Sequence, residues 1–201
     1  MDQHHPLTLY HDPTSEPCRA VHWFALEAGI ELDIELTWLT RGEHRHADFL
    51  RINPAHQVPV LRHGDLCLPE AAAILVYLAE LHGHEKQWVG QTVAARALTH
   101  RFLSWHHSNT RTTVTLDYAL PVLLMPAYNG HPIPEDDKVQ QLRARLMDSL
   151  AFLNNFLSEN GRFLGGKQPS IADIFISTDL FILDCDASAD HLFKPFPVVS
   201  D

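Results

Sequence analysis

The hydrophobic pattern of this 201-residue chain changes near residue 84, and that change restricts the folds that it can adopt. Before this point, short apolar runs of strand length alternate with amphipathic stretches of helical period. Beyond it, strand signals largely disappear and long stretches of helical period follow one another. The sequence therefore predicts an α/β unit over residues 1–84 and an all-helical unit over residues 85–201.

The first unit is expected to contain strands and helices in the order β-α-β-α-β-β-α. The expected strands cover residues 7–10, 33–38, 58–61 and 66–68, and the expected helices cover 17–28, 46–52 and 70–81. Apolar and polar residues alternate along 33–38, which is typical of a half-buried strand. Because the last two strands flank His63-Gly64-Asp65, they are expected to form a hairpin within a mixed four-stranded sheet.

The second unit is expected to consist of long helices and the segments between them. The helical patterns cover residues 92–116, 135–157 and 170–183. Between the first two of these patterns, prolines mark a break or an interrupted helix, at positions 121, 126, 132 and 134.

Composition and charge exclude several classes of protein. With 45% apolar residues the chain can fill a core, and with a net charge of -10 and scattered cations it is a poor binder of nucleic acid. Its three cysteines are far apart, which favours a reducing compartment. The N-terminus has no signal-peptide pattern, and the longest apolar run, residues 71–79, is too short to cross a membrane. We therefore expect a cytoplasmic protein that binds neither nucleic acid nor membrane.

The first candidate site joins the first strand to the first helix and contains Ser15 and Cys18. Unpaired N–H groups and the dipole at a helix start stabilise anions, thiolates included. A redox pair would need a second cysteine at position 15, but Ser15 can still donate its hydroxyl to the thiolate of a bound ligand. The residues alone favour a simpler interpretation, in which Ser15 caps the helix and Cys18 is buried.

Two further stretches allow a binding and a structural interpretation. A cis bond between Val58 and Pro59 would turn the Val58 backbone into a cleft, where an extended peptide could pair with it. The residues alone favour an ordinary trans turn. Glu70, at the start of another helix, can bind an ammonium group or simply stabilise the helix dipole.

Together, these stretches belong to a series of motifs that keeps its order along the chain. The motifs are Ser15-x-Pro-Cys-Arg-Ala-Val, Asn53-Pro54-x-x-x-Val58-Pro59-x-Leu61, Glu70-x-x-Ala73-Ile74-x-x-Tyr77-Leu78, Ala95-Arg96-Ala97, Trp105-x-His107-x-x-x-Arg111 and Ser170-Ile-Ala-Asp173. The series resembles the glutathione transferases, and specifically their theta class. Residues 7–83 resemble the thioredoxin-like domain of that family, and the last motif resembles its structural capping box.

The resemblance implies a serine-type glutathione transferase with an N-terminal thioredoxin-like glutathione-binding domain over 1–84. The all-helical domain over 85–201 would form most of the electrophile pocket. Ser15 would donate to the glutathione sulfur, and Arg111 would add positive charge near it. Glutathione is the implied co-substrate, with no metal, and a small electrophile such as a halide or an epoxide is the other substrate. The family also implies a homodimer and a role in detoxification.

The resemblance further assigns the residues that hold glutathione. They are Val58 beside a cis Pro59 for the cysteinyl backbone, His44 and Gln57 for the glycyl carboxylate, and Glu70 with the N–H of Ala71 for the γ-glutamyl end. Tyr10 and Cys18 are lesser candidates for contact with the sulfur.

Three features depart from the family pattern. Ala71 replaces a serine whose hydroxyl would donate to the γ-glutamyl carboxylate, and Glu16 places a negative charge where theta members commonly have glutamine. The sequence given ends at Asp201, where theta members continue for a few helices over the active site. We expect either a more open electrophile pocket or a sequence that continues beyond this residue.

Other functions are consistent with parts of the sequence. Ala71, Glu16 and the short C-terminus favour a non-catalytic binding or scaffold protein of the same fold. A glutathione-dependent reductase or isomerase would need cysteine in place of Ser15. The paired histidines lie on separate expected elements, so no metal site is expected; the pairs are His4-His5, His44-x-His46, His82-x-His84 and His106-His107.

Overall fold

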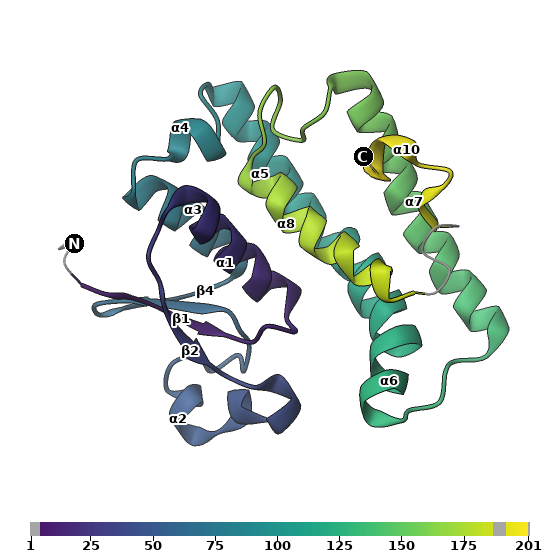
Figure 1. The fold of residues 1–201 in the computed structure, drawn as a ribbon, viewed down its shortest axis with the longest axis horizontal. Coiled ribbons are helices and arrows are strands. Elements are labelled where there is room, and N and C mark those ends of the chain that lie inside the picture. Colours follow the sequence, from purple (N-terminus) through teal and green to yellow (C-terminus); the bar gives the residue numbers. More distant parts are fainter. Residues whose placement is uncertain (1–4, 187–191, 201) are drawn as a thin grey trace. The chain divides into compact units, whose positions relative to one another are not determined.

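The computed structural model describes residues 5–186 and 192–200, and it divides the chain into two compact units, Met1–Trp88 and Val89–Asp201 (Figure 1). The break lies four residues beyond the change of pattern in the sequence.

The first unit contains a four-stranded sheet with the strand order β2-β1-β3-β4. β1 and β2 run parallel, whereas β1 with β3 and β3 with β4 run antiparallel. The predicted mixed sheet and the order β-α-β-α-β-β-α are therefore confirmed. The elements are β1 (Leu7–His11), α1 (Glu16–Ala28), β2 (Asp33–Leu36), η1 (Leu39–Arg41), η2 (Glu43–Arg45), α2 (Ala47–Leu50), β3 (Val60–His63), β4 (Leu66–Pro69), α3 (Ala71–Leu81) and α4 (Glu85–Trp88).

Alternate residues of the strands face two different layers of this unit. α1 and α3 lie on one side of the sheet and α2 lies on the other (Figure 1). Leu9 and Leu61 are fully buried, as is Phe24 of α1. The neighbouring Tyr10 packs in a second cluster with Phe49 of α2. Tyr10 therefore packs against α2, and its part as a lesser candidate for the sulfur contact stays a prediction.

Residues 33–36 form the predicted strand, but the prediction that this strand is half-buried is wrong. All four residues of β2 are exposed, and Ile34 and Leu36 keep 37% and 48% of their surface. β2 is the edge strand and pairs only with β1, so the helices on the two faces cover its side chains only in part.

In the described part of the second unit, helices joined by loops form the fold, as predicted. They are α5 (Val93–Ser108), the π-helix η3 (Thr110–Leu124), α6 (Met125–Asn129), α7 (Asp136–Asn160), α8 (Ile171–Leu180), η4 (Phe181–Cys185) and α10 (Pro197–Ser200). The capping box of Ser170 and Asp173 at the start of α8 is present. None of the described helices combines the length and apolarity needed to cross a membrane.

The helix predicted over residues 92–116 is interrupted at Asn109, which has φ -120° and ψ -94°. The Asn109 side-chain amide donates to the Trp105 carbonyl at 2.9 Å, and the Thr112 hydroxyl donates to the His107 carbonyl at 2.8 Å. Side chains that bond helix carbonyls compete with the backbone pattern of an α-helix, and the chain continues in the wider π form.

Candidate active site

Ser15 occupies the position that precedes the first turn of α1, but its side chain makes no capping hydrogen bond. It is only 7% exposed, and its backbone N–H donates to the Asp12 carbonyl at 3.0 Å. Its hydroxyl is instead directed at the thiol of Cys18. The interpretation of Ser15 as a simple helix cap is therefore wrong.

Cys18, in the first turn of α1, is fully buried, as expected. Burial raises the pKa of its thiol to about 11, although hydrogen bonds from the Asp12 backbone and the Ser15 side chain act in the opposite direction. Cys18 therefore remains a neutral thiol near neutral pH and is not itself a nucleophile.

Asp12 is a functional candidate that the sequence analysis missed. Its carboxylate is fully buried and accepts hydrogen bonds from the backbone N–H of Thr14 at 2.7 Å, the hydroxyl of Thr14 at 2.6 Å and the N–H of Leu39 at 2.7 Å. An aspartate two residues before a threonine in a Pro-containing loop is a signal for such a turn, and it could have indicated the first two bonds.

His44 lies in η2, in the segment that follows β2. The segment is closed on itself by a hydrogen bond from the Trp38 backbone N–H to the Glu43 carboxylate, at 2.7 Å. Burial lowers the pKa of His44, and the neighbouring Arg45 lowers it further. Among the described residues, its Nδ1 atom has no hydrogen-bond partner. The lowered pKa favours the neutral imidazole of His44, which can donate a hydrogen bond to a ligand or accept one from it.

The peptide bond between Val58 and Pro59 is cis. The trans turn favoured by the residues alone is therefore wrong, and the cis bond implied by the family resemblance is confirmed. The side-chain amide of Asn53 holds the preceding Gln57 carbonyl at 2.8 Å. Within the part of the chain that the structure describes, the backbone groups of Val58 make no hydrogen bond, so they can pair with an extended ligand.

Glu70 and Ala71 lie at the junction of β4 and α3. Glu70 is exposed and has φ 73° and ψ 107°, a backbone conformation that residues other than glycine rarely adopt. Ala71, the first residue of α3, is only 5% exposed. Strained residues of this kind cluster at ligand sites, so the junction is a candidate contact for a ligand.

The strand register brings these segments to one end of the sheet. Tyr10 pairs with Val60, and Val60 pairs with Pro69, so the three residues form a row across the sheet. Beyond this row lie the loop with Ser15, the Val58–Pro59 bond and the junction with Glu70. The segment with His44 follows β2, which ends opposite His11 in the same direction. The predicted glutathione-binding residues of the first unit therefore gather at the same sheet end.

Arg111 belongs to the second unit, in η3. Its guanidinium Nη1 atom lies 3.8 Å from Oδ1 of Asp179, a carboxylate of α8 that is fully buried. The same carboxylate accepts a hydrogen bond from the Thr115 hydroxyl at 3.1 Å, and its other oxygen lies 2.6 Å from Nε2 of buried His106. Asp179 therefore anchors Arg111 within the helical unit.

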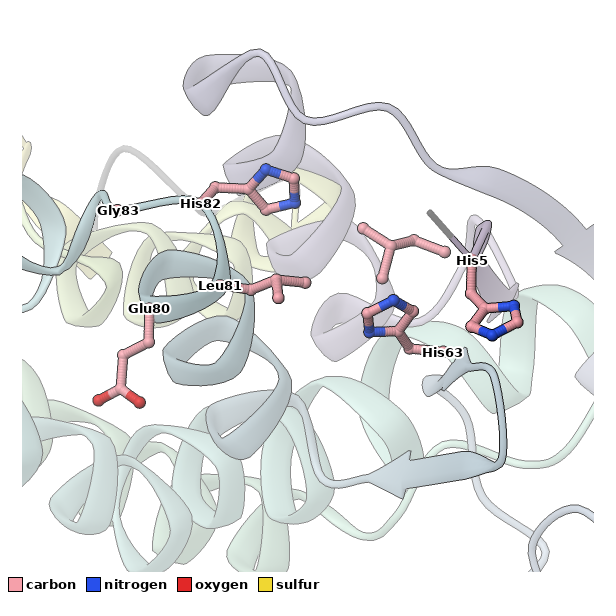
Figure 2. Close-up of a pocket in the computed structure, with 7 residues that line it drawn as sticks. His5, His63, Glu80, Leu81, His82 and Gly83 are labelled. Carbon is pink, nitrogen blue, oxygen red and sulfur yellow. The ribbon is translucent and has the colours of Figure 1, made fainter. Parts of the chain in front are cut away.

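A cavity of about 520 Å³ lies at the other end of the sheet. It is lined by Leu7 and His63, which pair at the start of β1 and the end of β3, together with His5 and the C-terminal end of α3. Figure 2 shows the imidazoles of His5, His63 and His82 around this cavity, whereas the Glu80 carboxylate points away from them. Since Ser15 and Pro59 lie at the opposite ends of the same strands, this cavity is not the predicted glutathione site.

Comparisons with known proteins cover both units. Residues 5–80 match the family model of the glutathione S-transferase N-terminal domain, and residues 136–199 match that of the C-terminal domain. The chain is 33% identical to mouse glutathione S-transferase theta-3 over 174 residues, which are 87% of this chain and 71% of the relative. It is also 33% identical to human glutathione S-transferase theta-1, over 87% of this chain and 72% of the relative.

Solved structures of theta-class glutathione transferases also match this chain. Human glutathione S-transferase T1-1 in its apo form matches with a TM-score of 0.86 and 31% identity, over 96% of this chain and 80% of the other. Human glutathione transferase theta-2, in complex with glutathione, matches with a TM-score of 0.85 and 31% identity, over 96% and 78%. With its two matched domains and these relatives, the chain belongs to the glutathione S-transferase family and to its theta-like class.

Proposed function

We propose that this protein is a serine-type glutathione transferase that joins glutathione to small electrophiles such as halides and epoxides. The observation that carries the proposal is that Ser15 is nearly buried at a helix start, while its hydroxyl stays out of the helix cap. A hydroxyl in this position can donate to a bound sulfur. Such a hydrogen bond favours the thiolate over the thiol, and a pKa lower by one corresponds to about 1.4 kcal/mol.

In the proposed complex, glutathione lies along the sheet end that carries Ser15. Three observations support this placement: the free backbone of Val58, the strained backbone of Glu70 and the unpartnered Nδ1 of His44. The proposed contacts are Val58 beside Pro59 with the cysteinyl backbone, His44 and Gln57 with the glycyl carboxylate, and Glu70 with the N–H of Ala71 at the γ-glutamyl end.

The proposed step is a nucleophilic attack by the glutathione sulfur. The thiol loses its proton to solvent, and the thiolate held by Ser15 forms a bond to the electrophilic carbon. In a halide the carbon–halogen bond breaks and the halide leaves with its electron pair. In an epoxide the carbon–oxygen bond at the attacked carbon breaks, and the oxygen keeps the electron pair and takes a proton from solvent. Arg111, held by Asp179, would add positive charge near the sulfur, and the helical domain would supply most of the electrophile pocket.

The same family membership supports a cytoplasmic homodimer with a role in detoxification. Analytical ultracentrifugation of the full chain tests the dimer, because the sedimenting mass distinguishes it from a monomer directly. A single species with the mass of one chain at micromolar concentration would contradict the proposed homodimer.

Replacing Ser15 with alanine tests the proposed activity. We expect Ser15→Ala to remain bound to immobilised glutathione, but to lose about a hundredfold in kcat/KM with aryl and alkyl halides, as for removal of a donor at a reacting anion. The pKa of the bound glutathione thiol, followed by thiolate ultraviolet absorbance, should rise. Ser170→Ala is the matched control, because Ser170 is another buried serine at a helix start. An alanine variant at position 15 as active as the wild type would refute the proposal.

A second candidate function is glutathione binding without catalysis. Ala71 lacks the hydroxyl that family members usually have at this position, and Glu16 places a carboxylate in the first turn of α1 that is only 4% exposed. Tight retention on glutathione with no turnover of any halide or epoxide would support this alternative. No retention at all would contradict both functions.

A further inference from the structure

We infer that Asp12 is a positioning residue for the proposed reaction, which fixes the Ser15 hydroxyl and the His44 segment relative to each other. The inference rests on the proposed function, in which these two groups hold opposite ends of the cysteinyl-glycine part of glutathione. Asp12 itself contacts neither glutathione nor the electrophile in this scheme.

On one side, Asp12 fixes the loop that carries Ser15. One carboxylate oxygen of Asp12 accepts both hydrogen bonds from Thr14, the residue immediately before Ser15. The backbone carbonyl of Asp12 accepts the N–H of Ser15, and its backbone N–H is directed at the sulfur of Cys18 at 3.5 Å. Side chain and backbone of Asp12 therefore determine together where the loop ends and the helix begins.

On the other side, Asp12 holds the segment that carries His44. Its second carboxylate oxygen accepts the N–H of Leu39, the first residue of η1. The Trp38 carbonyl accepts the backbone N–H groups of Arg41 and Glu43, so the segment between Leu39 and His44 is a compact double turn. A shift of Leu39 would therefore move His44 as well.

Because the Asp12 carboxylate is fully buried, its oxygens need hydrogen-bond partners. An anion with no exposed surface is costly unless its oxygens are paired, and here three donors satisfy them. After burial, the Asp12 charge is among the groups that raise the pKa of the adjacent Cys18 thiol. As a charge alone, Asp12 would likewise disfavour a bound thiolate. Loss of the positioning by Asp12 should therefore raise the pKa of a bound thiol, whereas loss of its charge should lower it. An experiment can separate the two effects.

The second unit offers a matched control carboxylate. Asp173 accepts a backbone N–H from Ser170 at 2.8 Å, the Ser170 hydroxyl at 2.6 Å and the N–H of Leu164 at 2.8 Å. The same three kinds of donor, at nearly the same distances, bind Asp12. Asp173→Asn therefore removes an equivalent set of interactions in a place where no glutathione contact is proposed.

The test compares Asp12→Asn, Ser15→Ala, the double variant and Asp173→Asn in the full-length protein. For each we measure the pKa of the bound glutathione thiol by thiolate absorbance, the KM for glutathione and the urea midpoint of unfolding. We expect Asp12→Asn to raise the thiol pKa, to raise KM and to lower kcat/KM on the order of tenfold, the scale of a charge-assisted hydrogen bond. Adding it to Ser15→Ala should raise the thiol pKa no further, because both act through one hydrogen bond.

Two results would overturn the inference. If Asp12→Asn changes the thiol pKa equally in the wild type and in Ser15→Ala, Asp12 acts through its charge alone and does not position Ser15. An equal shift in Asp173→Asn would show that the effect reflects lost stability alone. If Asp12→Asn does not fold, Thr14→Val takes its place, since it removes only the hydroxyl bond; it should shift the thiol pKa in the same direction by less, and an unchanged thiol pKa would refute the inference.

The design also separates this inference from the proposed function. If Ser15→Ala leaves the thiol pKa and the turnover unchanged, the proposed function itself is wrong. If Ser15→Ala raises the thiol pKa and Asp12→Asn has the same effect with and without the Ser15 hydroxyl, only the role of Asp12 is wrong.

Discussion

The environment of Cys18 determines which sulfur can react at the proposed site. Burial keeps Cys18 protonated, with a pKa raised to about 11. A neutral thiol accepts a hydrogen bond more weakly than a thiolate does, so a glutathione thiolate would take the Ser15 hydroxyl away from Cys18. The proposed chemistry therefore belongs to the co-substrate, and Cys18 serves as a buried neighbour that does not compete for the electrophile.

Position 71 offers a test of how tightly the γ-glutamyl end is held. Ala71→Ser would restore a hydroxyl donor at the start of α3, where the residue is already buried. A hydrogen bond to a carboxylate contributes roughly 1.5–3 kcal/mol, so the KM for glutathione should fall about tenfold or more. Steady-state kinetics with glutathione as the varied substrate measure this. Ala73→Ser, on the exposed side of the same helix, should leave KM unchanged; an equal effect of both variants would refute the γ-glutamyl contact.

The residues of this site could be predicted only in part from the sequence. Ser15, the cis Pro59 and Glu70 belong to motifs with fixed spacing, so the resemblance to a family was sufficient to single them out. Asp12 has no such signal for its most informative contact, because its partner Leu39 lies 27 residues away and the bond goes to a backbone N–H, which any residue but proline provides.

At the scale of elements, the capping box should contribute measurably to the stability of α8. In Ser170→Ala the helix loses a side-chain acceptor for a backbone N–H and the donor to Asp173, which costs about 1 kcal/mol of unfolding free energy. Urea denaturation measures the change. Ser158→Ala is the control, since the exposed Ser158 hydroxyl only bonds the Asn154 carbonyl within α7. Equal losses in the two variants would contradict a specific role of the box.

Elements were predictable where local signals are sufficient. Gly29, with φ 67°, ends α1 where the sequence placed its end, because a left-handed residue at that point favours glycine. The burial of β2 was not predictable, since it depends on the position of the strand at the sheet edge. The interruption at Asn109 depends on side chains that bond helix carbonyls, which an apolar period does not reveal.

At the scale of the whole molecule, several histidines should make the fold sensitive to mild acid. Burial is the largest cause that lowers the pKa of His11, His44 and His82 below the ordinary 6.5. A histidine with a lowered pKa in the fold binds its proton more tightly when unfolded. Its contribution to stability is therefore fully present above pH 6.5 and is lost as the pH falls through its folded pKa.

The buried His11 is the histidine best suited to test this. We expect the urea midpoint of the wild type to fall as the pH is lowered below 6.5, and His11→Gln to lose less over the same range. His131→Gln, in an exposed loop, should follow the wild-type curve. Parallel curves for His11→Gln and the wild type would show that His11 does not contribute.

The register of the sheet separates two kinds of loop. Every segment proposed to handle glutathione leaves the strands at one end, whereas the turn at Gly64 and Asp65 joins β3 to β4 at the other. A substitution in that turn should therefore leave the proposed reaction unchanged. The turn is a position in this unit where evolution could attach an added peptide, or an engineer a label, while the proposed catalytic residues keep their geometry.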